Sequence, residues 1–169
     1  IETSLSKSFF DRRMNAEIAV YAISGDKMIV NVPLKGYQNT GKVNNKGIEL
    51  AVTAEPAKDV TVNATYSYIN MENPVFATPE HHLFLNAHYR TGTLHLMAGI
   101  QQISNLDNDP SPAVNKVSYA LLNAKATFGF TPNIRIFVSG ENLLGTTYQV
   151  NRYYTMPGTT LFSGLNLSF

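Results

Sequence analysis

The sequence predicts an all-β protein made of antiparallel transmembrane β-barrel strands, about nine in number. Three observations predict this class: apolar and polar residues alternate with a period of two, short and long connections follow one another, and the last strand ends on Phe169. A period of two gives a strand one apolar and one polar face. Such strands suit a barrel whose outside meets lipid and whose inside meets water.

The composition fits one ordered unit and excludes several classes of protein. The chain has 169 residues, of which 44% are hydrophobic and 15% charged, with a formal net charge of +1. This balance argues against disorder, and the scattered Lys and Arg residues form no basic stripe, so we expect no nucleic-acid partner. The absence of cysteine excludes disulfides, thiol nucleophiles and Cys-ligated zinc. No run approaches the roughly 18 apolar residues of a membrane-spanning helix.

Alternation is clearest in residues 60–68, which place Val, Val, Ala, Tyr and Tyr on one face and Thr, Asn, Thr and Ser on the other. Burying Glu49 or Lys125 would be costly, so the second face of their strands must be wet. Several segments reach the roughly 9–11 residues that a tilted strand needs to cross a bilayer. We expect strands at residues 2–10, 14–24, 41–55, 60–71, 80–90, 93–104, 117–130, 133–142 and 159–169.

The connections between these strands alternate in length. The short ones are expected at residues 11–13, 56–59, 91–92 and 131–133, and the long ones at 25–40, 72–79, 105–116 and 143–158. Short periplasmic turns and long extracellular loops are typical of outer-membrane barrels. A soluble β-sandwich binding domain is the less favoured alternative, since its strands average about 5–6 residues and its long loops need not share one end.

Strand direction indicates that this is part of a larger barrel. If the last strand descends to the periplasm, the first descends as well, so Ile1 begins at the extracellular side. Single-chain bacterial barrels close with an even number of strands, so upstream strands are expected to complete this one. Residues 2–10 should then expose an edge unless a partner covers it. A complete small barrel of about eight strands with adhesive or binding loops is the alternative architecture.

Three motifs occur in order along the chain: Asn-Lys-Gly-Ile-Glu-Leu at residues 45–50, Gly-Glu-Asn-Leu-Leu at 140–144 followed by Tyr148, and Pro-Gly at 157–158 before the last strand. A glycine can ease a wide loop into a strand, and the Asn142 amide can tie the loop backbone that follows it. Singly these features are weak. As an ordered set, over residues 14–169, they resemble the end of TonB-dependent outer-membrane receptors.

The resemblance implies a plugged barrel of about 22 strands in the outer membrane of a Gram-negative bacterium. It implies import of a scarce, bulky nutrient, such as siderophore-bound iron, haem or cobalamin, with TonB-coupled energy. The plug domain and the motif that contacts TonB would lie outside residues 1–169. The implied partners are outer-membrane lipid, the TonB complex through the missing N-terminal region, the barrel-assembly machinery and a small nutrient ligand. A surface lipoprotein is a further candidate partner.

Aromatic and cationic side chains in the long loops could stack on a ligand, although the aromatic ones also fit an interfacial girdle. Adjacent strand residues point to opposite faces, which weakens any paired role for the two neighbouring histidines. We expect ligand contacts in the extracellular loops from Tyr37, Phe76, His81, His82, Arg152, Tyr153 and Tyr154.

Metal binding and catalysis find little support. Asp107 and Asp109 place oxygen ligands in one loop, but the loop lacks the glycine and distal glutamate of a calcium-binding loop, so they are weak metal candidates. The absence of a Gly-x-Ser-x-Gly elbow and of His-Glu-x-x-His indicates that the protein is not an enzyme, and no cofactor is expected. The resemblance further implies an assembly signal on the apolar face of the last strand, formed by Leu161, Leu165, Leu167 and Phe169.

Overall fold

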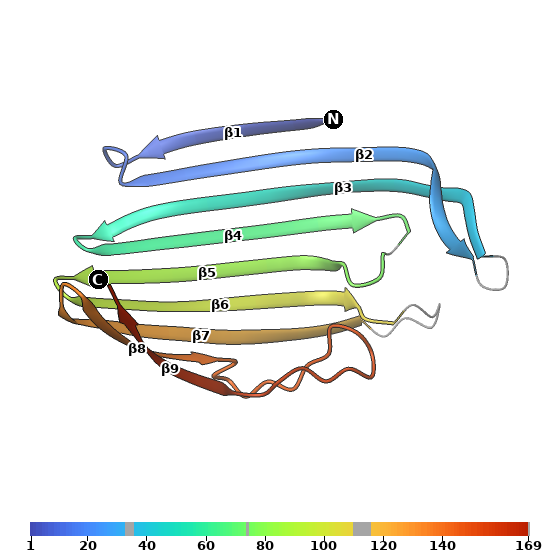
Figure 1. Ribbon diagram of the computed structural model, residues 1–169. Coiled ribbons are helices and arrows are strands. Elements are labelled where there is room, and N and C mark those ends of the chain that lie inside the picture. The colour runs from blue at the N-terminus through green and yellow to red at the C-terminus, as the bar shows by residue number, and fades with distance from the viewer. Residues whose placement is uncertain (33–35, 74, 110–115, 169) are drawn as a thin grey trace.

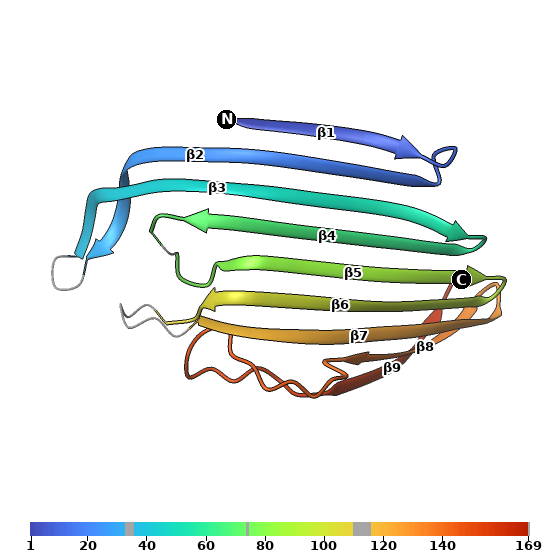
Figure 2. The same cartoon turned by 180° about the vertical axis from the view of Figure 1, so that it is seen from behind.

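The computed structural model describes residues 1–32, 36–73, 75–109 and 116–168. In these ranges the chain forms nine antiparallel strands in one sheet, each hydrogen-bonded to the next in sequence order (Figures 1 and 2). A single sheet argues against the sandwich alternative, which needs two packed sheets. The strands are β1 (Glu2–Phe9), β2 (Met14–Val32), β3 (Gly36–Ala57), β4 (Val60–Met71), β5 (Pro79–Thr91), β6 (Leu94–Asp107), β7 (Lys116–Thr131), β8 (Ile134–Glu141) and β9 (Thr160–Leu167).

The register sorts the side chains into two faces, because residues paired across strands share a face. Ala64 pairs with Val52 and Leu85, so these three lie on one face, which we call the outer face. Its large apolar side chains are uncovered; Leu83 and Leu85, for example, are 39% and 41% exposed. Among the described residues, the buried hydrophobic ones are few: Ala19, Ile103, Leu106 and Leu121.

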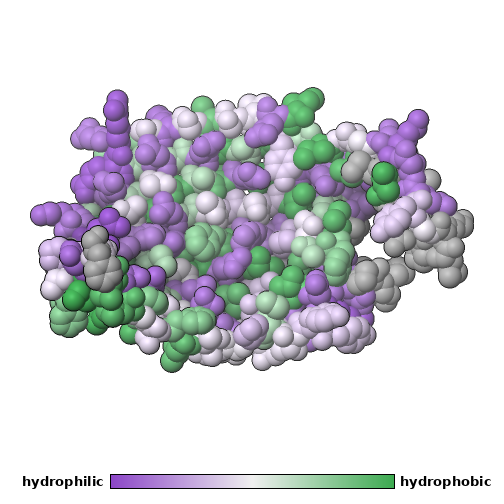
Figure 3. Space-filling view, viewed as in Figure 1, coloured by the Kyte–Doolittle hydropathy of each residue, from purple (hydrophilic) through white to green (hydrophobic). Residues whose placement is uncertain are grey.

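The opposite face is polar and concave. The sheet curls so that β8 and β9 come toward the viewer in Figure 1. Hydrophilic residues are spread widely over the face seen from that side, with hydrophobic residues between them (Figure 3). We call it the concave face; it carries Thr65, paired with Ala51 and Phe84, and Lys125, paired with Met97 and Ser139. Glu49 and Lys125 therefore share one polar face, as expected.

The expected strands are all found, but one expected loop is wrong. The sequence predicts a long connection at residues 25–40, whereas β2 and β3 pair as far as Val32 and Gly36. The two strands extend as a hairpin beyond their neighbours (Figure 1). The pairing contains irregularities between Gly25 and Ile29, and Lys27 has a φ of 60°. These bulges interrupt the period of two, which concealed the hairpin in the sequence.

The ends of the sheet differ in their connections. Residues 10–13, 58–59, 92–93 and 132–133 join strands at one end, which we call the short-turn end. The three longest connections, residues 72–78, 108–115 and 142–159, lie at the other, which we call the long-loop end. Among the described residues, the first strand, β1, pairs with β2 alone, so the expected exposed edge at residues 2–10 is confirmed for Glu2–Phe9. Within the described ranges no pairing joins β1 to β9, which argues against a complete small barrel.

Candidate ligand site at the long-loop end

Three connections at the long-loop end are joined through residues 107–109. The backbone N–H of Ala77 donates to the carbonyl of Asp107 at 2.9 Å, and the N–H of Arg152 donates to the carbonyl of Asn108 at 2.8 Å. The Arg152 guanidinium also forms an ion pair with the Asp109 carboxylate. Since Asp107, Asn108 and Asp109 are only 7%, 4% and 8% exposed, they form a buried polar anchor for the surrounding loops.

An aromatic tip projects from the anchor. Gln149 and Thr155 form an isolated β-bridge, and the N–H of Tyr153 donates to Gln149 Oε1 at 3.1 Å. Tyr153 and Tyr154 at the tip are 80% and 72% exposed. The Arg152 guanidinium lies 4.9 Å from the centroid of the Tyr153 ring. Exposed rings beside a fixed cation can stack on a planar ligand and attract an anionic one.

The charge of this tip does not depend on ordinary pH changes. The hydrogen bond to Asp109, with a further contribution from Tyr153, raises the pKa of the Arg152 guanidinium above its usual range. Arginine is already protonated at physiological pH. The Arg152 guanidinium therefore stays protonated and paired with the Asp109 carboxylate.

The other two aromatic residues predicted to contact a ligand, Phe76 and Tyr37, lie in different places relative to the buried anchor. Phe76 is 42% exposed and precedes Ala77, so it lies beside the anchor. Tyr37 is 81% exposed and lies on the extended β2–β3 hairpin. The structure thus brings Phe76 to the same loop cluster as Arg152, whereas Tyr37 belongs to a separate projection.

His81 and His82 lie on opposite faces, as adjacent strand residues should. His81 is on the outer face, where its Nδ1 lies 2.8 Å from the Tyr66 hydroxyl and its ring stacks on Tyr68 at 4.8 Å. His82 is on the concave face, and its Nε2 lies 2.9 Å from Gln101 Nε2. The expectation that this pair points in two directions is confirmed.

The two aspartates considered for metal binding have protein partners. Asp109 binds Arg152, and its backbone N–H donates to Asp107 Oδ1 at 3.3 Å. Among the residues that the structure describes, no group of three or more His, Cys, Asp or Glu is placed to hold a metal ion. Nor does this part of the chain hold a helix long and apolar enough to cross a membrane.

Asn142 ties the last long loop, as its position after a strand predicts. Its Oδ1 accepts from the N–H of Thr146 at 3.0 Å, and its Nδ2 donates to the carbonyls of Thr146 and Pro157 at 2.8 and 3.2 Å. The residue is 5% exposed and has a φ of 49°, a conformation that asparagine tolerates better than most residues. One side chain therefore holds both ends of the loop.

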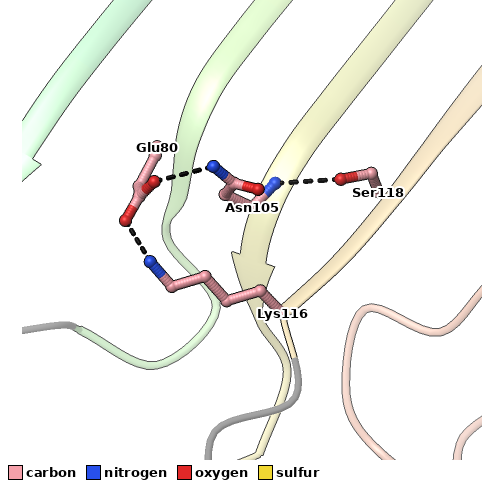
Figure 4. Close-up of polar contacts among 4 residues, drawn as sticks. All are labelled: Glu80, Asn105, Lys116 and Ser118. Atoms are coloured by element: carbon pink, nitrogen blue, oxygen red, sulfur yellow. Dashed lines mark hydrogen bonds and ion pairs between the residues drawn. The ribbon is translucent and has the colours of Figure 1, made fainter.

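Sequence reasoning missed a polar cluster that joins three strands at the long-loop end (Figure 4). Glu80 on β5 forms an ion pair with Lys116 on β7 and accepts a hydrogen bond from Asn105 Nδ2 on β6 at 2.8 Å. The backbone N–H of Asn105 donates to Ser118 Oγ at 3.1 Å. Only the cross-strand register could have revealed this cluster, because its members are far apart in sequence.

The last strand presents its leucines outward. Leu161, Leu165 and Leu167 pair with Gly140, Ile136 and Ile134 on the outer face and are 71%, 56% and 51% exposed. Phe169, the fourth residue of the expected assembly signal, lies outside the described residues. Recognition of this strand by the assembly machinery stays a prediction.

Comparison with known proteins identifies the family. The family model described as "TonB dependent receptor-like, beta-barrel" matches residues 1–143, whereas no curated protein matches the chain. The siderophore receptor PiuA from Acinetobacter baumannii is similar in structure, with a TM-score of 0.81, 19% identity, and coverage of 98% of this chain and 28% of that one. For the ferric-catecholate import receptor Fiu from E. coli K12 the TM-score is 0.77, the identity 21%, and the coverage 99% and 27%.

The copper transporter OprC is also similar, with a TM-score of 0.77, 14% identity, and coverage of 99% of this chain and 30% of that one. The chain therefore spans less than a third of the length of these three solved structures. At such low identities the structural likeness shows the fold alone. The family match, which covers most of the chain, shows that the protein belongs to the TonB-dependent receptors, within their β-barrel.

Proposed function

We propose that the chain forms part of the wall of an outer-membrane active transporter in a Gram-negative bacterium. The transporter imports a scarce, bulky nutrient with TonB-coupled energy. The observation that carries the proposal is the division of one antiparallel sheet into an uncovered apolar face and a polar concave face. Membership of the receptor family supports it.

Siderophore-bound iron is the leading candidate cargo, with haem and cobalamin as further members of the same class. PiuA is described as a siderophore receptor and Fiu as a ferric-catecholate import receptor. The chemistry of the aromatic tip agrees with this choice, because ferric catecholate complexes are aromatic and anionic. Copper is the competing cargo, since OprC is described as a copper transporter.

Within such a transporter, residues 1–169 supply strands and loops, and other parts of the receptor supply the plug and the TonB contact. Outer-membrane lipid would cover the outer face, and further strands would cover the edges of β1 and β9. The barrel-assembly machinery, which would read the last strand, and a surface lipoprotein are additional proposed partners.

The proposed ligand contacts centre on the loop cluster. Arg152, Tyr153 and Tyr154 would supply cation and aromatic contacts, with Phe76 beside them. Tyr37 would approach from the extended hairpin, and His82 would face a ligand that enters the concave side. His81 belongs instead to the aromatic cluster on the outer face, so its proposed environment is the membrane interface.

Uptake by the full-length receptor in cells tests the proposal. A Tyr153→Ala, Tyr154→Ala double variant should reduce uptake of a radiolabelled ferric catecholate siderophore roughly tenfold at limiting ligand, because two aromatic contacts are lost. Tyr89→Ala is the matched control: Tyr89 is also exposed, but it pairs with Leu96 on the outer face. Deletion of TonB should abolish the uptake that remains in every variant.

The competing cargoes give distinct outcomes in the same strain. Uptake of copper, haem or cobalamin in place of the ferric siderophore would overturn the siderophore assignment. It would still support the assignment as a transporter. Uptake of none of these ligands, or uptake that persists without TonB, would contradict the transporter itself.

A further inference from the structure

Hydrogen-bond donors gather on the outer face at its long-loop end. Lys46 on β3 pairs with Asn70 on β4, and in the adjacent cross-strand row Tyr68 pairs with His81 on β5. Tyr68 and Asn70 are an even number of residues from Ala64 along β4, so they and the residues paired with them share its outer face. We call the set of Lys46, Asn70, Tyr68 and His81 the donor cluster.

The donor cluster has hydrogen-bonding capacity to spare. The side chains of Lys46 and Asn70 are exposed, and in the described part of the chain neither one takes part in a hydrogen bond or an ion pair. The carboxylate that follows β4, Glu72, accepts from Asn44 Nδ2 at 2.8 Å. An ammonium group offers three donors and an amide two. The cluster therefore presents one positive charge and several unused N–H groups.

The two rings of the donor cluster are held in place by each other and by Tyr66. The ring of His81 stacks on Tyr68 with centroids 4.8 Å apart, and its Nδ1 lies 2.8 Å from the Tyr66 hydroxyl. When Nδ1 accepts from that hydroxyl, Nε2 carries the proton and can donate to a ligand. The hydroxyl of Tyr68 is a further donor. All four members of the cluster can thus donate to one acceptor group.

The position of the donor cluster along β4 matches the level of lipid headgroups. At the short-turn end of the outer face, Val60 pairs with Tyr89, and Asn70 lies ten residues farther along the strand. Ten residues extend about 33 Å along a strand, or about 25 Å across a membrane at a tilt of about 40°. This equals the height of the apolar surface of a membrane barrel. With Tyr89 at one membrane interface, where tyrosine is enriched, the cluster lies at the other.

Between these two levels the outer face suits acyl chains. The rows next to the donor cluster across β3, β4 and β5 are formed by Leu50, Tyr66 and Leu83, and then by Val52, Ala64 and Leu85. A ligand whose chains follow these apolar rows places its headgroup on the cluster. The position and the chemistry together indicate an amphipathic ligand with an anionic headgroup.

We propose that the donor cluster binds the phosphate of an anionic lipid in the leaflet at the long-loop end. The inference rests on the proposed function, because it takes the outer face to be the surface that meets the membrane. Lys46 would supply the positive charge, which attracts anionic lipid. Asn70, Tyr68 and His81 would donate to the remaining phosphate oxygens.

Photo-crosslinking of the full-length receptor in vesicles tests this proposal. The vesicles contain phosphatidylcholine and a minor fraction of lipid A, whose phosphates are monoesters. A photoreactive amino acid replaces Ile48, which pairs with Tyr68, or Ala54, which lies on the outer face nearer the short-turn end. The residue at 48 should capture lipid A roughly tenfold beyond its share of the vesicle lipid. The residue at 54 should capture the two lipids in proportion to their amounts.

Variants of the donor cluster locate the effect. The Lys46→Gln, Asn70→Leu double variant should remove the excess of lipid A at position 48, whereas Lys46→Arg should keep it because arginine retains the charge. Lys7→Gln is the matched control and should leave the excess unchanged. Lys7 is on the outer face too, but at the short-turn end, where its ammonium group lies 5.4 Å from the centroid of the Phe9 ring.

Capture at 48 in proportion to the vesicle lipid would overturn the proposal. So would an excess that survives the double variant, or an equal excess of lipid A from which the phosphates have been removed. Heat-modifiable migration in detergent reports barrel formation in each variant. These results concern the donor cluster alone, whereas a folded receptor that captures no lipid at either position would contradict the proposed function, since its outer face would not meet the membrane.

Discussion

Single glycines reveal how closely aromatic rings cover the concave face. A Cβ added at Gly47 would lie 2.3 Å from Cζ of Tyr21, and one at Gly164 would lie 2.5 Å from Cε1 of Phe137. Each ring comes from the neighbouring strand and lies on the glycine backbone. At these two positions, glycine is required by the ring above it rather than by its own backbone angle.

Gly47→Ala should therefore destabilise the receptor by about 1–3 kcal/mol, the usual cost of overpacking. The measurement is the temperature at which the heat-modifiable folded band disappears. Gly158→Ala is the matched control, because nothing lies within 4 Å of a Cβ at that position. Adding Tyr21→Ala to Gly47→Ala should recover part of the loss; equal melting of both glycine variants would contradict the argument.

Asn142 concentrates several interactions in one buried side chain. Asn142→Ala removes its bonds to Thr146 and Pro157 and places alanine at a φ of 49°, so we expect a loss of about 2–4 kcal/mol. Asn142→Gly keeps the backbone conformation and should lose less. Faster proteolysis within residues 143–158, with the rest of the chain intact, would show that the alanine variant loosens this loop. Unchanged cleavage in the alanine variant would contradict the role of Asn142 in holding it.

At the scale of strands, local sequence pattern accounts for most of the fold. The alternation in residues 60–71 predicts the bounds of β4, Val60–Met71, because each side chain meets only lipid-like or water-like surroundings. Pairings between distant segments are not encoded locally. The β2–β3 extension contains bulges, and the contacts of Arg152 with Asp109 and of Glu80 with Lys116 depend on how loops and strands meet.

Adjacent residues of β4 test the two faces directly. Ala64 lies on the outer face and Thr65 on the concave face, near Glu17 and Glu49. Ala64→Arg should cost about 2–4 kcal/mol if it lies near the middle of the bilayer, whereas Thr65→Arg should be tolerated. Urea unfolding of the receptor in lipid vesicles measures both; similar costs would mean that the faces do not differ in environment.

For the whole molecule, the uncovered outer face and the two open edges have one common explanation. Apolar side chains exposed over an entire face are an aggregation hazard in water, as are unpaired strand edges. In the proposed transporter, lipid would cover the apolar face and further strands would pair with the open edges. The three solved structures with this fold are much longer than this chain, which covers 27–30% of their length.

The central claim, that the outer face meets lipid and the concave face meets water, is tested most directly by fluorescent labelling along β7. The chain contains no cysteine, so single cysteines can replace Ala124 and Ala126 on the outer face and Lys125 and Thr127 on the concave face. In vesicles containing the full-length receptor, probes at 124 and 126 should be quenched by nitroxide lipids, and probes at 125 and 127 should not. Quenching without this period of two, or equal access of aqueous iodide to all four probes, would contradict the account.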